Sequence, residues 1–574
     1  MNKGQKTILI LGAGTMQIPA IKLAKEEGFY TIVADGNAKA PGISFSDRFF
    51  HIDLKDEKGM VKAARSVDRK RGLDGVFTAG TDFSATVAYV AERLGLPGIP
   101  YQAALNASRK TRMRKVFSEK GIPSPKFTWV SKQETAIENI ADAGLTYPLV
   151  VKPADNMGAR GVKAVENDPS LTAAVAEALL YSRTSTVIIE EYLDGPEFSL
   201  DAVVYKGKAY ICGNADRHIR YYPYFIEMGH TMPTTALPNV VNEVEHVFKK
   251  AIYALGITEG AAKGDIKYTQ RGALAGEVAA RLSGGYMSGW TFPYSADFYV
   301  TKTALRIAVG LNPLPIQYTY TKTSAERAVI SMPGIIKKVE GVEKVRKRPN
   351  IMDVFPTVRA GDTTIFPTNN VEKCANVIAC SSDRGSAEKH AFDACKNIFF
   401  ELKPATNSTF EFIFSSLLEQ NTYHGEPFFP KAYDVCKEGL KKMRYIYKGK
   451  TENADAKTGT AVVIASLPGF ETMDKIASVS KRSVFKGRYG SDLHQELEQA
   501  ADIRTVEIVP IKELYNGNPN SALSGLIIGS FFWYALFAGG KQGAVWAIDT
   551  IKVFSRNNKS IEEEIKKWIP ADVS

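Results

Sequence analysis

Two carboxylates and one guanidinium near the middle of the chain could hold a metal ion and a phosphoryl group. Asp265 and Glu277 fall within residues 264–268 and 275–279, two short segments separated by a glycine-containing turn. We expect two antiparallel strands that hold the acids side by side. Such a pair suits Mg²⁺, which completes its coordination with water and phosphate oxygens. Arg281 follows closely and could bind a phosphoryl group, although an ordinary charged hairpin would carry the same residues.

Three small residues come directly after this arginine, namely Ser283, Gly284 and Gly285. A glycine amide has no side chain to keep an anionic oxygen at a distance. We therefore predict that this segment contacts the substrate.

A second group of residues could hold a triphosphate. Lys152 lies at the end of the apolar segment 148–153, just before Pro153, and residues 155–162, DNMGARGV, follow as a glycine-containing loop. The lysine supplies a point charge, and the loop amides can approach phosphate oxygens closely. A plain hairpin turn would have a similar composition.

A third group follows at residues 187–205, VIIEEYLDGPEFSLDAVVY. Such a segment can join two lobes of a nucleotide site. Backbone groups of Tyr192 and Leu193 could meet the edge of an adenine, and Glu197 could accept ribose hydroxyls. The alternative for Glu197 is a surface acid on a strand.

The elements that must position these groups begin with residues 7–108, where short apolar strands alternate with amphipathic helices. This pattern predicts a doubly wound parallel sheet, with residues 94–100 continuing the strands. Residues 12–17 begin like the dinucleotide fingerprint but carry Gln17 in place of the third glycine, so a substrate-binding or structural loop is favoured over an NAD site. Residues 78–82 follow another strand, where open α/β sheets place ligands.

Composition sets outer limits on the function. The 574 residues suffice for roughly three or four domains, and a net charge of +11 favours anionic ligands without any recognisable nucleic-acid module. The five cysteines fit no metal motif, and we interpret them as reduced thiols of a cytoplasmic protein.

Two apolar segments are candidates for a targeting or membrane signal. We expect the N-terminus to form a first strand rather than a signal peptide. Residues 522–540 carry no charge, and we favour a buried helix there over a membrane span.

The motifs occur in a fixed order: Lys110, VVKP, DNMGARGV, IIEEYLDGPEFS, GDIKY and EVAARLSGG. Together they resemble the ATP-grasp superfamily of carboxylate–amine ligases over roughly residues 1–405. The resemblance is nearest to the L-amino-acid ligase subgroup, which residues 223–230 with Pro233 also fit. It implies an α/β protein with a pre-ATP-grasp domain (1–108), a two-lobed ATP-grasp domain with antiparallel sheets (109–312), and a small C-terminal lid domain with its connecting segment (313–450).

The resemblance also implies roles for individual residues. Lys110 and Lys152 match the lysines that contact ATP phosphates, and a mobile loop covers the phosphates. The adenine hinge and the ribose contact complete the nucleotide site. The expected ATP-binding residues are Lys110, Lys152, Gly158, Ala159, Arg160, Gly161, Val162, Glu190, Glu191, Tyr192, Leu193 and Glu197.

Metal and substrate roles follow from the same resemblance. Asp265 and Glu277 match the Mg²⁺ ligands, and Arg281 with Lys152 forms the expected catalytic pair. The expected substrate-binding residues are Glu227, His230, Ser283, Gly284 and Gly285, with a structural hydrogen bond as the alternative for His230. One position departs from the family, because Ala279 stands where many members carry a third metal ligand, an asparagine. A second Mg²⁺ is therefore in question.

The implied activity is a Mg-ATP-dependent ligase that activates a small carboxylate as an acyl phosphate and joins it to an amine. The implied partners are these small molecules, with ATP and Mg²⁺ or Mn²⁺ as cofactors, no nucleic acid, no membrane, and a homodimer as one expected assembly. Two alternatives remain open, a bicarbonate-using carboxylating or carbamoylating enzyme and an ATP-binding regulator without turnover.

The C-terminal region lies outside this resemblance. Residues 401–414 are expected to form a strand and 430–447 a helix. Apolar segments at 461–468 and 505–511, with helices at 491–501 and 560–568, predict an additional small α/β domain over 460–574. Its role does not follow from the sequence.

Overall fold

The computed structural model describes residues 4–418 and, nearer the C-terminus, residues 531, 535, 542–543, 545–554 and 556–568. The predictions for residues 430–447, 461–468, 491–501 and 505–511 lie outside these described residues. Within the expected apolar helix 522–540, residues 531 and 535 are described, and both are helical and buried.

The N-terminal residues form the predicted doubly wound parallel sheet, here with the strand order β3-β2-β1-β4. Successive side chains of its central strand enter two different hydrophobic cores, because neighbouring residues of a strand point to opposite faces. The strands are β1 (Thr7–Leu11), β2 (Tyr30–Asp35), β3 (Arg48–His51) and β4 (Gly75–Phe77). The helices packed on them are α1 (Ile18–Glu26), α2 (Glu57–Arg71) and α3 (Ser84–Leu94).

The expected strand at residues 94–100 is wrong. Gly95 ends α3 in a left-handed conformation, and the chain runs as a loop to α4 (Tyr101–Ser108). Pro97 and Pro100 explain the difference, because neither has an N–H group for a strand ladder.

The loop after β1 is packed by its own glutamine. The Gln17 side chain donates to the Ala79 carbonyl at 2.5 Å. A Cβ added at Gly12 would lie 3.0 Å from the Gln17 side chain, so the glutamine fills the space beside this glycine. The Ala13 N–H donates to Asp35 at 2.7 Å. These contacts give the partial fingerprint a structural role.

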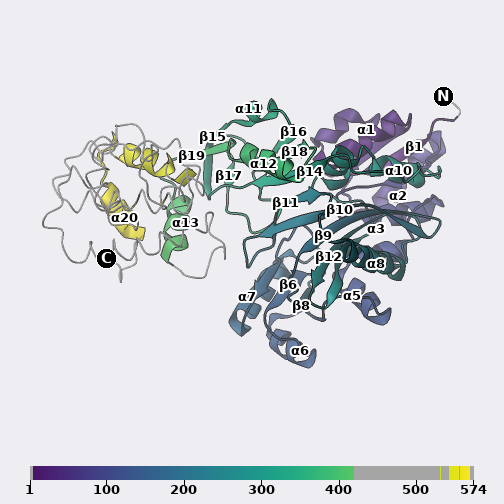
Figure 1. Cartoon of the computed structure of the whole chain (residues 1–574), viewed down its shortest axis with the longest axis horizontal. Coiled ribbons are helices and arrows are strands. Elements are labelled where there is room, and N and C mark those ends of the chain that lie inside the picture. Colours follow the sequence, from purple (N-terminus) through teal and green to yellow (C-terminus); the bar gives the residue numbers. More distant parts are fainter. Residues whose placement is uncertain are drawn as a thin grey trace.

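The next domain has two lobes, and the smaller one is an antiparallel sheet with the order β5-β8-β6-β7. Helix α5 (Lys110–Glu119) leads into it. In Figure 1 this lobe projects from the large sheet, with β6, β8, α6 and α7 labelled. Its elements are β5 (Phe127–Val130), α6 (Ala136–Asp142), β6 (Leu149–Pro153), β7 (Lys163–Val165), α7 (Asp168–Tyr181) and β8 (Val187–Glu191).

The larger lobe is part of an eight-stranded sheet with the order β13-β12-β9-β10-β11-β14-β18-β16. Its first five strands are β9 (Glu197–Tyr205), β10 (Lys208–Arg220), β11 (Ile226–Met232), β12 (Gly260–Thr269) and β13 (Gly272–Ala279). Helix α8 (Pro238–Leu255) packs on β12 and β13. A π-helical turn (Met287–Thr291), α9 (Phe292–Ala296) and α10 (Val300–Ala308) follow.

The small domain continues this sheet without a break. Strand β14 (Thr323–Val329) pairs with β11, and β18 (Ala375–Ser381) and β16 (Ile351–Pro356) complete the edge. Helix α12 (Arg384–Cys395) packs on β14 and β18. A three-stranded sheet combines β15 (Gly334–Glu340), β17 (Thr363–Thr364) and β19 (Phe399–Leu402), with α11 (Val342–Arg346) nearby.

The expected strand over residues 401–414 is also wrong beyond β19. Residues Asn407–Leu418 form helix α13. The phenylalanines at 410, 412 and 414 alternate as in a strand, but all three are buried in one core with residues distant in sequence. That core includes Phe531, Trp546 and residues of α20 (Ile561–Trp568), so tertiary packing decides the conformation. Helix α20 confirms the helix expected at 560–568.

Two further expectations concern thiols and membranes. Cys212, Cys374, Cys380 and Cys395 carry free thiols, and Cys436 lies outside the described residues. None of the helices in the described part of the chain is long and apolar enough to span a bilayer.

The C-terminal residues should contribute directly to the stability of the small domain. Trp546 is buried, its ring lies 4.9 Å from that of Phe410, and its indole N–H donates to the Lys403 carbonyl at 3.1 Å. Trp546→Ala should lower the free energy of unfolding by about 3–5 kcal/mol. Trp129→Ala is the control, because Trp129 is 48% exposed and should cost about 0.5 kcal/mol. Urea unfolding followed by circular dichroism compares the two, and equal costs would contradict the packing described.

Candidate active site

A cavity of about 700 Å³ lies between the two lobes and reaches the loops of the N-terminal sheet. Gly80 and Thr81 line it from the segment after β4, as expected for a strand end. With the exception of Gly161, every residue predicted to bind ATP, metal or substrate lines this cavity. Cationic side chains outnumber carboxylates eight to six among its lining residues, which suits a polyanionic ligand.

The predicted acid pair is formed by two directly paired residues. Strands β12 and β13 are antiparallel, and Asp265 lies opposite Glu277 in their register. The register shifts at the next position, leaving Gly276 as an extra residue on β13. Arg114 donates to the carbonyls of Ala275 and Gly276 at 3.2 and 2.6 Å, which holds this bulge in place. The hairpin predicted from the sequence is therefore confirmed.

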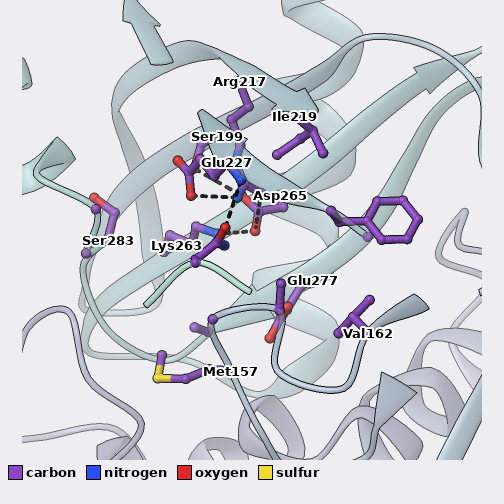
Figure 2. Close-up of a pocket in the computed structure, with 18 of the residues that line it drawn as sticks. Met157, Val162, Ser199, Arg217, Ile219, Glu227, Lys263, Asp265, Glu277 and Ser283 are labelled. Carbon is purple, nitrogen blue, oxygen red and sulfur yellow. Dashed lines mark hydrogen bonds and ion pairs between the residues drawn. The ribbon is translucent and has the colours of Figure 1, made fainter. Parts of the chain in front are cut away.

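Asp265 sits in a network of charged side chains (Figure 2). The Ser199 hydroxyl donates to its Oδ1 at 3.0 Å, and Arg217 contacts its Oδ2 at 3.0 Å. Lys263 forms an ion pair with the same Oδ2. Arg217 also pairs with Glu197 and, at 2.9 Å, with Glu227. One guanidinium thus joins acids predicted to serve the ribose, the metal and the substrate.

Glu277 is the more accessible acid of the pair, with 40% of its side chain exposed and Lys110 Nζ at 3.4 Å. Burial alone raises the pKa of Glu277, but Lys110, Lys263, Lys152 and Arg281 together outweigh burial and lower it to about 2. The carboxylate is ionised at neutral pH. An ionised acid with exposed oxygens beside Asp265 is a donor set that fits a hard divalent cation.

Lys152 is held by a buried acid. Its Nζ lies 2.7 Å from Glu190 Oε2, and Arg114 Nε lies 2.7 Å from Glu190 Oε1. Burial raises the pKa of Glu190, yet these two cations outweigh it and lower the pKa. The Glu190 carboxylate therefore positions Lys152. Because both oxygens of the Glu190 carboxylate are engaged, any contact of Glu190 with adenine would have to use its backbone groups.

The loop after Lys152 turns through left-handed residues. Gly158, Ala159 and Gly161 have φ of 70°, 59° and 66°. At Gly161 a Cβ would also lie 2.8 Å from the Tyr181 ring, so this glycine serves the turn and its packing rather than the cavity wall. Such turns gather N–H groups that bind anions. The Lys110 ammonium donates to the Asn156 carbonyl at 2.7 Å and brings the loop to the acid pair.

The hinge residues Glu191, Tyr192 and Leu193 line the cavity, and at least three of their backbone groups are already engaged, including the Glu191 N–H, which donates to the Lys126 carbonyl at 3.1 Å. The Tyr192 N–H donates to the Pro148 carbonyl at 3.2 Å. The Leu193 carbonyl accepts from Lys267 at 2.8 Å. The base contact remains a prediction for the other backbone groups of this hinge.

Arg281 ties the cavity to the N-terminal sheet. Its Nε donates to the Thr81 carbonyl and its Nη1 to the Leu282 carbonyl, both at 2.9 Å. A Cβ on Gly284 would lie 3.1 Å from the Gly80 Cα. Close packing of two backbones therefore explains Gly284 without a substrate, although both glycines also line the cavity.

The expected substrate side is fixed largely by protein contacts. His230 is buried, with Nε2 2.7 Å from the Thr291 hydroxyl and Nδ1 3.5 Å from Glu326, which agrees with the structural alternative. Ser283 donates to buried Asp201 through its N–H and its hydroxyl, at 2.7 and 2.5 Å. Burial raises the pKa of Asp201 to about 6, despite these hydrogen bonds.

Glu227 connects the small domain to the cavity. Its N–H donates to Asn370 Oδ1 at 2.7 Å, and its carbonyl accepts from Lys373 at 2.9 Å. The Asn370 N–H in turn donates to the Gly158 carbonyl at 2.9 Å. Burial raises the pKa of Glu227, but Arg217, Lys373 and His230 together lower it to about 2.

Sequence reasoning missed several of these residues. Lys263 precedes Asp265 by two positions on one strand, so it shares the face of the acid, and this signal was present in the sequence. Arg217, Asn370 and Lys373 reach the cavity from β10 and from the segment before β18, and no local pattern connects them with the acid pair.

The buried Glu190 should stabilise the fold much more than its neighbour Glu191. Glu190→Gln should cost about 3–5 kcal/mol, because it leaves Arg114 without its charge partner in the interior. Glu191→Gln is the control, because Glu191 pairs with half-exposed Arg271 and should cost about 1 kcal/mol or less. Urea unfolding at pH 7 measures both.

The pH dependence gives a second readout of the same variants. The folded protein lowers the pKa of Glu190 below its ordinary value of 4.5, so this stabilisation is present above about pH 4.5 and is lost as the pH falls. The difference between the wild type and Glu190→Gln should therefore shrink in acid. A pH-independent difference would contradict the charge assignment.

Three known domain families match parts of this chain. The ATP-grasp domain family matches residues 145–289, the ATP-grasp N-terminal domain 21–98, and the L-amino acid ligase C-terminal domain 2 residues 327–403. The protein y4rH of Sinorhizobium fredii is 22% identical over 65% of this chain and 75% of its own length. Carnosine synthase 1 of Mus musculus is 24% identical over 54% of this chain, and the match spans 40% of the mouse protein.

A solved structure shows the same fold. The L-amino acid ligase from Bacillus licheniformis superposes with a TM-score of 0.60 at 21% identity, covering 70% of this chain and all of the ligase. The matched domains lead to one assignment. The chain carries an ATP-grasp N-terminal domain, an ATP-grasp domain and an L-amino acid ligase C-terminal domain 2, in that order.

Proposed function

We propose that this protein is a Mg-ATP-dependent ligase that joins the carboxylate of an amino acid, or of a related small acid, to an amine. One observation carries the proposal most directly. Lys110, Lys152 and Arg281 line the same cavity as the paired acids Asp265 and Glu277. This supports a site in which the cations would meet a triphosphate and the acids would bind a metal ion.

In the proposed reaction, a carboxylate oxygen attacks the γ-phosphorus of ATP, and the bond to the bridging oxygen breaks to release ADP. The amine nitrogen then attacks the carbonyl carbon of the acyl phosphate. Inorganic phosphate leaves with the bonding electrons, and the nitrogen loses a proton. The protein would contribute mainly positioning and charge neutralisation.

The residues divide this work by location. Lys152, fixed by Glu190, and Lys110, beside Glu277, would face the phosphates below the 155–162 loop. Arg281, anchored to the Thr81 carbonyl, would steady the acyl phosphate. Mg²⁺ bound by Asp265 and Glu277 would neutralise phosphate charge and orient the leaving group.

Two features of the small domain favour an amino acid as the substrate. This domain belongs to the family named for L-amino acid ligases, and it meets the substrate side through Asn370 and Lys373 on the backbone of Glu227. The ionised Glu227 carboxylate would favour an ammonium or amine group nearby. Contact of Asn370 with Gly158 would keep the phosphate loop closed and exclude water from a reactive intermediate.

Turnover with defined substrates tests the proposal. Release of ADP and phosphate should require an amino-acid carboxylate together with an amine, and mass measurement should find the condensed product. Pairs of amino acids are the first panel to screen. Strict dependence on bicarbonate would instead support the carboxylating alternative, and nucleotide binding without turnover on any pair would support a regulatory role.

Arg281 should be required for turnover but not for nucleotide binding. Arg281→Ala should lower kcat by about 10²–10³ because it removes a preorganised cation at the reacting phosphoryl group. The affinity for ATP, measured by calorimetry, should change little. Arg359→Ala is the control, because the Arg359 side chain is 90% exposed on the small domain. Unchanged turnover in Arg281→Ala would contradict the assigned role.

A further inference from the structure

Lys263 occupies a defined place opposite Ala279. The register of β12 and β13 pairs Lys263 with Ala279, two positions from the pairing of Asp265 with Glu277. Directly opposite residues of antiparallel strands hold their Cβ atoms about 4.5–5.5 Å apart. The short alanine leaves the space above it to the lysine side chain, which lines the cavity and is 15% exposed.

The oxygens of Asp265 have limited capacity for metal ions. Oδ2 accepts a hydrogen bond from the Lys263 ammonium and lies 3.0 Å from the Arg217 guanidinium, and these two positive charges disfavour a metal ion on that oxygen. Oδ1 accepts one bond from Ser199 and keeps one lone pair. Asp265 can therefore offer one position to a metal ion while these contacts persist.

Asp265 and Glu277 are the two carboxylates that the register places side by side. Among the described residues, no cluster of three or more histidine, cysteine, aspartate or glutamate side chains could hold a metal ion, so an ion here would depend on this pair and on phosphate oxygens. Glu277 is the other acid of the pair, and Lys263 is one of the cations that lower its pKa. The ammonium of Lys263 thus acts on both acids.

We propose that the site takes one divalent cation with ATP, and that the Lys263 ammonium supplies the positive charge that a second cation would otherwise bring beside Asp265. The proposal rests on the proposed function, because it assumes that ATP and a divalent cation bind in this cavity. Lys263 is a positioning residue here, since it acts through Asp265 and through the phosphate charge rather than by reacting.

A tethered ammonium differs physically from a second metal ion. It carries one charge instead of two, and the fold has already removed most of its contact with water, since the Lys263 side chain is 15% exposed. It is also present at every concentration of free metal. The activity of a one-metal site should rise with free Mg²⁺ along a curve with a single binding step once ATP is saturating.

Counting bound metal tests the inference without relying on turnover. The full-length protein is saturated with the non-hydrolysable analogue β,γ-imido-ATP, and Mn²⁺ is titrated while paramagnetic resonance reports free and bound ions. The wild type should bind one Mn²⁺ per nucleotide and give the spectrum of an isolated ion. Lys263→Met, which keeps an unbranched side chain but removes the charge, should bind two and show coupling between them.

Two variants serve as controls. Lys263→Arg keeps a cation and should remain at one Mn²⁺. Lys338→Met removes a lysine that also pairs with an acid two positions later on a strand, Glu340, but on an exposed surface, so it should behave as the wild type. Labelled nucleotide in the same samples reports binding of the analogue.

The outcomes separate the two levels of the proposal. Two Mn²⁺ ions per nucleotide in the wild type, or one in Lys263→Met, would overturn the role of Lys263 and leave the ligase assignment standing. A wild type that binds no nucleotide would overturn the proposed function and this inference with it.

Discussion

The site depends on the register of the large sheet. In β9 and β12, alternate residues point to opposite faces: Glu197, Ser199, Lys263, Asp265 and Lys267 line the cavity, whereas Phe198, Leu200, Ala262 and Ile266 enter a hydrophobic core. A slip of one residue would turn the acids into that core and the apolar side chains into the cavity. Burying unpaired acids costs far more than such a slip could recover, so the core and the site enforce the same register.

The second constraint is charge balance in a partly buried space. Burial alone would raise the pKa of Glu190, Glu227 and Glu277 and favour their neutral forms. Neighbouring lysines and arginines reverse this effect and keep all three ionised. Each acid thereby fixes a cation in return, as Glu190 fixes Lys152 and Glu227 fixes Arg217. Asp201 accepts its hydrogen bonds from neutral Ser283. The more distant charges of Lys263 and Arg281 do not outweigh burial, and the pKa of Asp201 is raised to about 6.

Local patterns in the sequence predicted what local physics controls. The alternation and turn around Asp265 and Glu277 gave the hairpin, and the strand–helix alternation gave the N-terminal sheet. Lys152 and the glycine loop likewise fall where their motifs placed them. The strand predicted over residues 401–414 was wrong beyond Leu402, because alternating phenylalanines fit either a strand or a helix that is buried on several sides. Distant residues such as Trp546 decide between the two. Asn370 could not be predicted, because its partners Glu227 and Gly158 meet it only in the folded chain.

The pairing of β11 with β14 bears on how this protein can be cut and recombined. A division at residue 312 looks natural by sequence, yet Gly229, His230, Thr231 and Met232 pair across it with residues 324–327. Severing the chain there would leave two long strand edges with unpaired backbone groups, which are templates for aggregation. Chimeras that exchange the small domain of one ligase for another would therefore need to carry β11 along with it. The segment to exchange would therefore begin before β11 rather than at residue 312.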